Sequence, residues 1–366
     1  TCAAGRAPCL NHVIEVTNRA APRGNASAAA RPEIYISGAL HGDEAVGVAT
    51  ALELVRWLVT RYAFDPWVRR LVDTRVLVVT PMTNAVGYER SQRYELDVDP
   101  NRDFPYEQRP HSCMGSVAAR TVNELYRTHL FSLALTFHGG MQALGYAWGA
   151  PSYYNYRTRR SQPAPDKLAL HAIGSAMSSW AGSGNVRANE LYKVGSMNER
   201  VYPVAGGMED WSYGGSWNPT HATPCTPKQN GGYALAKTRY DDAVVRVPMF
   251  LVETSDHKRP PEAELGAEGG VYAPDSSADG HVPRNTRLAL VALDVAAPHV
   301  AIAASGSSAS TADGPCLALE WQVWGAFSVD ESAAVWRPSA TADWRPLPFV
   351  RADWLRASAG AGSPLL

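Results

Sequence analysis

Two residues that could bind a metal, His41 and Glu44, stand where an apolar strand pattern gives way to a helical one. The strand pattern covers 34–36, and the helical pattern covers 45–62. An imidazole nitrogen and a carboxylate at this His-x-x-Glu spacing can supply two of the three protein ligands of a catalytic zinc site. The same spacing is common by chance, as a helix cap or a surface pair, so the metal hypothesis needs a third ligand elsewhere.

A second strand end offers that ligand. His138 follows the apolar run 133–137 and precedes two glycines, which allow backbone and substrate to approach closely. A simple turn histidine is the alternative. Glu253 follows a further apolar run, 249–252, and is a candidate general base, with a strand-end ion pair as its alternative.

The polar segment between these strands carries three more candidates. Asp99 could accept a hydrogen bond from the far nitrogen of a metal-binding histidine and so fix its tautomer. Arg102 offers a planar fork suited to a carboxylate, and Asn101 adds an amide donor, so together they could grip a chain terminus. A surface Asn-Arg turn is the alternative. The segment 81–105 reads as one long loop, and such loops in compact domains usually serve a function.

Length and charge limit the classes of function. At 366 residues the chain predicts one large domain and a smaller one. A net charge of -1 and a pI near 6.8 predict no affinity for nucleic acid. No apolar run reaches the roughly 18 residues of a membrane span. The sequon at Asn25 suits a secreted or lumenal protein, and a cytoplasmic location is the alternative.

The five cysteines lack the clustering of metal ligands. Cys2 with Cys9, or Cys113 with Cys225, are two pairings that the sequence leaves open.

Alternating strands and helices indicate an α/β fold with a site at the carboxyl ends of the strands. Strands are expected at 13–16, 34–36, 76–79, 133–137 and 249–252, and helices at 45–62, 117–130, 165–180 and 286–295. The first helix is expected to align Val48, Leu52, Val55, Leu58 and Val59, and the third to align Leu168, Ile173 and Met177. Beyond Ala296 the composition shifts. We therefore expect a catalytic domain at 1–297 and a short β-rich C-terminal region at 298–366, which is too small to be complete.

Six sequence blocks, in this order, resemble the zinc metallocarboxypeptidases, the funnelin family. They are His41-Gly-Asp-Glu44, Pro81-Met-Thr-Asn84 with Gly87-Tyr88, Asp99-Pro-Asn101-Arg102-Asp-Phe, His138-Gly-Gly, Tyr202-Pro-Val-Ala-Gly-Gly-Met-Glu209-Asp-Trp211 and Glu253-Thr-Ser-Asp. The glycines after His138 and the methionine beside Glu209 are more similar to the carboxypeptidase N/E branch than to the A/B branch. The resemblance implies a mixed central sheet flanked by helices, and an enzyme that uses one Zn²⁺ per chain to cleave the C-termini of peptides or proteins.

The resemblance also implies a role for each residue. His41, Glu44 and His138 would bind zinc, and Glu253 would activate the hydrolytic water.

The remaining roles concern the substrate. Asn101 and Arg102 would grip its C-terminal carboxylate, with Tyr202 as a lid over it. The family's carbonyl-polarising arginine fits Arg93 best and Arg90 second.

Glu209 matches the family position at the floor of the pocket for the departing side chain. An acid there would select Lys or Arg by charge pairing, whereas a solvent-facing Glu209 would have no such effect.

The sequence departs from the family pattern in two places. The segment 214–240 is an insertion that could reshape the rim, and the family's amino-terminal helix is absent, so we expect the natural protein to be longer.

Two other functions compete with the peptidase. An aspartoacylase-like or succinylglutamate-desuccinylase-like amide hydrolase shares the His-Gly-x-Glu start, an Asn-Arg pair and a later histidine. The block from Tyr202 to Trp211 and the chain length disfavour it. A catalytically silent binding protein on the same scaffold would normally lack a ligand or the base, and none is missing.

Overall fold

The structure of the protein is a computed structural model. It describes residues 10–20, 31–184, 190–216, 218, 220–228, 232–238 and 246–296, and the backbone of 299–311, 314–324, 335–336 and 345–346. The chain divides into two compact units, Thr1–Ala297 and Pro298–Leu366.

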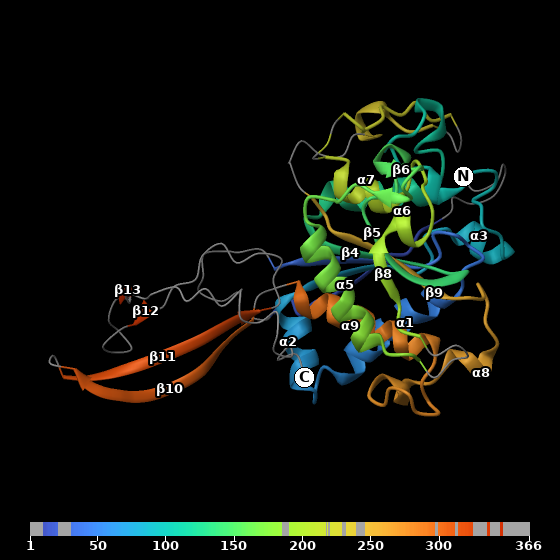
Figure 1. The fold of residues 1–366 in the computed structure, drawn as a ribbon. Coiled ribbons are helices and arrows are strands. Elements are labelled where there is room, and N and C mark those ends of the chain that lie inside the picture. The colour runs from blue at the N-terminus through green and yellow to red at the C-terminus, as the bar shows by residue number, and fades with distance from the viewer. Residues whose placement is uncertain are drawn as a thin grey trace. The chain divides into compact units, whose positions relative to one another are not determined.

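The first unit is built on a mixed sheet of seven strands (Figure 1). In spatial order they are β1 (Ile14–Val16), β3 (Val76–Thr80), β2 (Glu33–Ser37), β4 (Phe131–His138), β9 (Met249–Ser255), β5 (Met141–Tyr146) and β8 (Lys193–Ser196). Strands β3, β2, β4 and β9 are parallel, β1 pairs antiparallel with β3, and β5 pairs antiparallel with β9. The expected mixed sheet with flanking helices is therefore confirmed.

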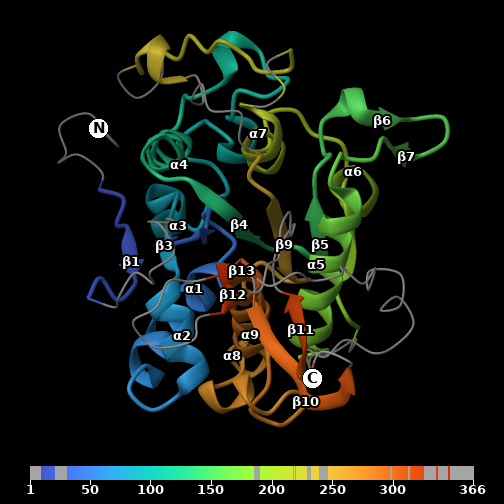
Figure 2. The same cartoon turned by 90° about the vertical axis from the view of Figure 1, so that its left-hand side faces the viewer.

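Helices cover both faces of this sheet. They are α1 (Val46–Arg61), α2 (Pro66–Thr74), α3 (Ala85–Arg90), α4 (Val117–Thr128), α5 (Lys167–Ala181), α6 (Met197–Arg200), α7 (Met208–Gly214), α8 (Glu262–Leu265) and α9 (His281–Val295). Helices α1, α5 and α9 lie on one face, and α4 and α7 on the other (Figure 2). Almost all of α9 is buried, because it packs between α1 and α5.

The buried stripes of α1 and α5 differ from the expected ones. In α1 the side chains of Leu52 and Val59 are 45% and 62% exposed, while Leu54 and Trp57 are buried. In α5 Leu168 is 87% exposed. Val48, Leu58 and Met177 are buried as expected, so the expected stripes were wrong only in part. Each included apolar residues on the solvent side of the helix, because the residues facing the sheet decide which stripe is buried.

The segment 81–105 is not the structureless loop that its polar residues suggested. It contains helix α3 and a 3-10 turn, Pro100–Arg102. The side chain of Asn84 caps α3 by accepting from the amide of Gly87, and Asp99 caps the 3-10 turn by accepting from the amide of Asn101. These polar residues therefore begin helical turns.

The second unit contains β10 (His299–Thr311) paired antiparallel with β11 (Gly314–Trp324), and β12 (Val335–Trp336) paired with β13 (Arg345–Pro346).

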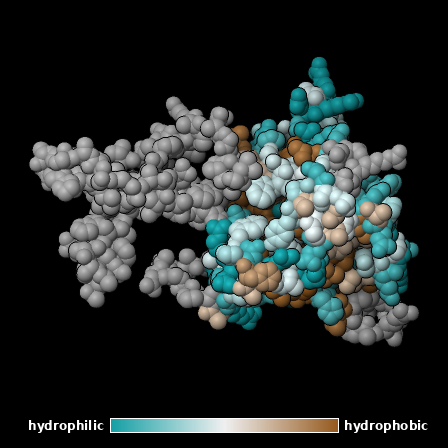
Figure 3. Space-filling model, turned by 90° about the horizontal axis from the view of Figure 1, so that it is seen from below, coloured by the Kyte–Doolittle hydropathy of each residue, from teal (hydrophilic) through white to brown (hydrophobic). Residues whose placement is uncertain are grey.

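The surface of the first unit mixes residue types. On the face in Figure 3, hydrophobic residues occur as separate patches among hydrophilic ones. None of the described helices combines the length and apolar character required to cross a membrane.

Candidate active site

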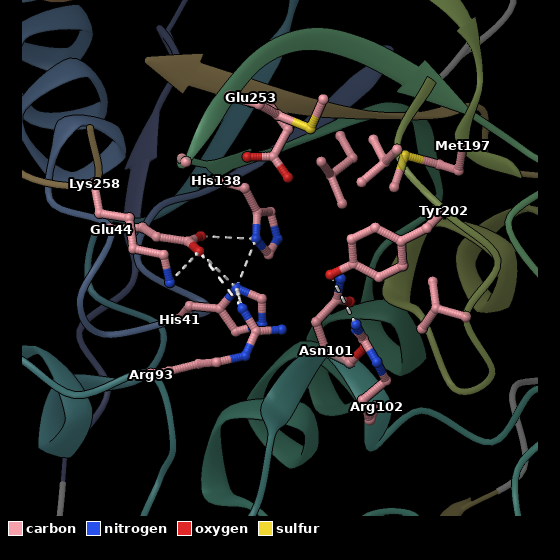
Figure 4. Close-up of a pocket in the computed structure, with 16 residues that line it drawn as sticks. His41, Glu44, Arg93, Asn101, Arg102, His138, Met197, Tyr202, Glu253 and Lys258 are labelled. Carbon is pink, nitrogen blue, oxygen red and sulfur yellow. Dashed lines mark hydrogen bonds and ion pairs between the residues drawn. The ribbon is translucent and has the colours of Figure 1, made fainter. Parts of the chain in front are cut away.

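Three chain segments meet at one edge of the sheet (Figure 4). Strands β2 and β4 are parallel neighbours, so their carboxyl ends lie together. His41 and Glu44 lie in the turn that joins β2 to α1, and His138 is the last residue of β4. Glu253 in β9 is paired in register with His138. The sheet thus gathers residues that lie far apart in the sequence.

The two histidines and Glu44 form a compact, buried donor set. Nδ1 of His41 lies 3.0 Å from Oε1 of Glu44, and Nδ1 of His138 lies 2.9 Å from Oε2 of Glu44. One ligand atom from each residue lies within 4.8 Å of the other two. The Nε2 atom of His138 is buried and has no hydrogen-bond partner among the described residues. Two imidazoles and one carboxylate are the donors of many catalytic zinc sites, so these residues fit the metal that the sequence predicts.

The protonation of this set favours metal binding at His138 and Glu44. Burial lowers the pKa of His138 to about 4, so its imidazole is neutral. Burial works against the charge on Glu44, yet His41 and His138 hold the pKa of Glu44 well below its usual value. Burial also disfavours charge on His41, but Glu44 and Asp99 together raise its pKa. A metal ion, which needs a neutral imidazole, would therefore compete with a proton at His41.

Asp99 lies at the far nitrogen of His41, whereas Nη1 of Arg93 lies 3.1 Å from Nδ1, the nitrogen that faces Glu44. Oδ1 of Asp99 lies 3.0 Å from Nε2 of His41, which is the contact that the sequence led us to expect. The Nε of Arg93 donates to Oδ2 of Asp99 at 2.8 Å, and Nη1 of Arg93 lies 3.7 Å from Oε1 of Glu44. Arg93 lines the cavity, whereas Arg90 is exposed at the end of α3.

An open cavity of about 190 Å³ adjoins the donor set. Arg93, Asn101, Arg102, Tyr202 and Glu253 all line it. An apolar wall is formed by Met197, Val201, Val204 and Leu251. The structure therefore brings into one cavity most of the residues that the sequence singled out.

Asn101 and Arg102 are held by the turn that contains them. The Oδ1 of buried Asn101 accepts from the amide of Met208 at 2.9 Å, which fixes the orientation of the side-chain amide. Nη2 of Arg102 donates to the hydroxyl of Tyr202 at 3.2 Å, and the Tyr202 ring lies 5.7 Å from the guanidinium. Tyr202 is half exposed and covers Arg102 at the cavity.

Glu209 is completely buried, at 0% exposure, so the solvent-facing alternative is wrong. It lies in the first turn of α7 and does not itself line the cavity. Neither carboxylate oxygen of Glu209 makes a well-formed hydrogen bond among the described residues. Burial raises the pKa of Glu209, and the nearby side chains of Asn101 and Arg102 oppose that rise. The adjacent Asp210 accepts from the amides of Gly149, at 2.9 Å, and Ala150. Burial and Glu209 raise the pKa of Asp210 well above its usual value.

Glu253 lies beside the donor set. Its Oε2 is buried without a partner among the described residues, and burial, together with the charge of Glu44, raises the pKa of Glu253 to about 8. The sequence interpretation missed Lys258, which lies in the loop after β9 and also lines the cavity. Its position five residues after Glu253 was the available signal.

The structure contains a disulfide between Cys113 and Cys225, which confirms one of the two pairings left open. Cys2 and Cys9 lie outside the described residues, as do parts of the insertion 214–240. The described part of the insertion pairs with the segment after Arg102, since the amide of Glu107 donates to the carbonyl of His221 at 2.8 Å. The disulfide therefore joins the insertion to the segment that follows the Asn-Arg pair.

Comparison with known proteins agrees with this geometry. A family profile described as zinc carboxypeptidase matches residues 11–239. Carboxypeptidase SOL1 of Arabidopsis thaliana is 26% identical over 206 residues, which are 55% of this chain and 40% of that protein. Carboxypeptidase M of Mus musculus is 25% identical over 197 residues, which are 50% of this chain and 44% of that protein. The chain thus spans less than half the length of these curated relatives.

A solved structure gives the same fold. The crystal structure of thrombin activatable fibrinolysis inhibitor is similar with a TM-score of 0.51 and 16% identity, over 77% of this chain and 65% of that chain. The profile match extends over more than half of the sequence, from β1 through α7. The chain belongs to the zinc carboxypeptidase family.

Proposed function

We propose that the protein is a zinc-dependent metallocarboxypeptidase that hydrolyses the C-terminal peptide bond of peptides or proteins. One observation carries this proposal: the His41, Glu44 and His138 donor set opens onto a cavity that Asn101 and Arg102 also line. A zinc ion held by the donor set would supply a Lewis acid that polarises the scissile carbonyl and lowers the pKa of a water molecule. The Asn-Arg pair would hold the terminal carboxylate of the substrate.

Carboxylate binding follows from the chemistry of Arg102. Its planar guanidinium can donate two parallel hydrogen bonds to a carboxylate, and Asn101 can add a donor from its amide nitrogen because its oxygen is already engaged by Met208. The hydroxyl of Tyr202 lies within hydrogen-bond distance of Arg102 and would close over the bound terminus. A free C-terminus is therefore the expected recognition element.

Two residues would act on the reacting bond. Glu253 would take the proton of the attacking water, since its buried, unpartnered Oε2 and raised pKa suit a group that must hold a proton during the reaction. Arg93 would stabilise the negative charge that develops on the carbonyl oxygen. Its guanidinium is fixed by Asp99, so little reorganisation is required.

A preference for C-terminal Lys or Arg is part of the proposal. Glu209 is buried and does not itself line the cavity, so a cationic side chain would pair with its charge only after displacing part of the cavity wall. The proposed similarity to the carboxypeptidase N/E branch rests on Met208, beside Glu209, and on Gly139 and Gly140.

A secreted or lumenal location is supported by the Cys113–Cys225 disulfide, since such bonds persist in oxidising compartments.

Metal analysis combined with a matched peptide panel tests the proposal. The purified protein should contain one zinc per chain and should cleave acylated dipeptides with a free C-terminus but not their C-terminal amides. Cleavage of acyl amino acids without action on peptides would instead favour the amide hydrolase. Stoichiometric zinc without any turnover would favour the silent binding protein.

A further inference from the structure

Lys258 contacts the metal-ligand turn through both its backbone and its side chain. Its carbonyl accepts from the amide of Ala45 at 3.0 Å. Its ammonium donates to Oδ2 of Asp43 at 2.8 Å and lies 3.2 Å from Oε1 of Glu44 (Figure 4). One residue of the loop after β9 is therefore joined to three successive residues of the turn.

The same side chain also passes the second ligand-bearing segment. A Cβ atom placed on Gly140, two residues after His138, would lie 3.6 Å from Cε and 3.8 Å from Cγ of Lys258. The aliphatic part of Lys258 therefore lies against Gly140, in the turn that follows β4. Lys258 thus bridges the two segments that carry the donor set.

We propose that Lys258 is a positioning residue of the metal centre, which holds the carboxylate of Glu44 in the orientation that faces the two histidines. This inference rests on the proposed function, because it requires the donor set to bind a metal. The ammonium occupies the side of Oε1, while Oε2 of Glu44 lies 2.9 Å from Nδ1 of His138. Without Lys258, Oε1 of Glu44 would be held, among the described residues, only by His41, at 3.0 Å, and by the more distant Arg93, so the carboxylate would rotate more easily away from His138.

The positive charge of Lys258 has the opposite effect on metal binding. An ammonium beside a metal ligand repels a divalent cation, so removing it could tighten metal binding. Asp43, however, lies 2.8 Å from the ammonium, and the Lys258–Asp43 pair carries no net charge. The field of a neutral pair falls off steeply, whereas loss of a residue that orients a ligand typically weakens metal binding 10- to 100-fold. The effect of Lys258 on the orientation of Glu44 should therefore outweigh its repulsion of the metal ion.

The two effects predict opposite results for Lys258→Met and the same direction of change for Asp43→Asn. If positioning dominates, Lys258→Met raises the zinc dissociation constant about 10- to 100-fold. Asp43→Asn, which releases the ammonium from its anchor, also raises it, and the double variant is no weaker than Lys258→Met alone. If charge dominates, Lys258→Met tightens zinc binding and Asp43→Asn weakens it.

Zinc affinity is measured on metal-free protein by competition with a chromophoric chelator. The absorption spectrum of the Co²⁺ form, which reports ligand geometry, should change in Lys258→Met. The matched control is Lys237→Met, which removes another lysine–carboxylate pair, 2.8 Å from Glu124, and should bind zinc like the wild type.

Zinc binding by Lys258→Met that equals or exceeds that of the wild type overturns the inference. If that variant does not fold, as judged by circular dichroism of the metal-free protein, the Co²⁺ spectrum of Asp43→Asn decides. A purely electrostatic effect would weaken binding without changing the ligand geometry, so an unchanged spectrum overturns the inference. A wild-type protein that binds no stoichiometric zinc removes the proposed function itself, which is a separate result.

Discussion

Replacing Glu209 by Gln should remove the preference for C-terminal lysine. A lysine ammonium that came within about 4 Å of this buried carboxylate would gain roughly 4 kcal/mol at an effective dielectric constant near 20. Transfer of the ammonium out of water offsets part of that gain. At about 1.4 kcal/mol per tenfold, we expect kcat/KM for a lysine peptide to fall roughly 100- to 1000-fold. A matched phenylalanine peptide should change little.

The assay compares kcat/KM for acylated dipeptides that differ only in a C-terminal Lys or Phe. Because burial raises the pKa of Glu209, the carboxylate form becomes more populated as pH rises. The ratio of Lys to Phe hydrolysis should therefore increase with pH in the wild type while the substrate lysine remains charged. The Gln variant should show no such increase.

Asp210→Asn provides the matched control, because Asp210 belongs to the same buried pair but is already bonded to the amides of Gly149 and Ala150. Asn at this position keeps an oxygen that can accept from both amides but removes the acid coupled to Glu209, so the Lys to Phe ratio should change far less than in Glu209→Gln. A wild type that prefers Phe, or a Glu209→Gln variant with the wild-type ratio, would refute the assignment of Glu209 to the specificity pocket.

Four further predictions use other parts of the structure. Glu253→Gln should lower kcat at least about 100-fold while metal analysis still finds one zinc, and unchanged turnover would exclude Glu253 as the base. Arg93→Met should lower kcat about 100- to 1000-fold, and a change confined to KM would contradict its proposed role. Replacing both Cys113 and Cys225 by Ser opens a loop of 112 residues and should lower the free energy of chemical unfolding by about 2–5 kcal/mol, whereas equal stability would count against the disulfide. Burial raises the pKa of Asp103 to about 7. The stabilisation from its protonated form is complete below the unfolded pKa near 4 and is lost as pH rises to about 7, by roughly 2 kcal/mol between pH 5 and 7. Asp103→Asn should lack this part of the pH dependence in denaturation experiments, and an identical dependence would contradict the assignment.

The four parallel strands were identifiable because strands buried on both faces read as continuous apolar runs. Val76–Thr80 and Met249–Ser255 are examples, and each observed strand extends the expected one by a few residues at most. Polar residues that directly follow such runs were then expected to meet at one edge of the sheet. That reasoning placed His138 and Glu253 side by side without any knowledge of the intervening chain.

Strands β5 and β8 lack such a signal, because their sequences are short and contain glycine. Tertiary packing requires glycine at position 145 in β5, because a Cβ atom on Gly145 would lie 2.1 Å from Sδ of Met197 in α6. Helix α7 was not among the expected helices for a similar reason, since Gly206 and Gly207 precede it. Helix α2 could have been found, because Asp65 and Pro66 are a standard helix start, and Asp65 caps it.

The wrong interpretation of 81–105 bears on the metal centre itself. A Cβ on Gly42, between the two ligands of the first block, would lie 2.0 Å from the carbonyl carbon of Gly87 in α3. The amide of Gly42 also approaches the carbonyl of Arg93 at 3.4 Å. Helix α3 is thus the surface against which the turn carrying His41 packs. Spacing alone identifies two ligands, but their positions depend on this packing, which involves residues that the sequence pattern assigned to a loop.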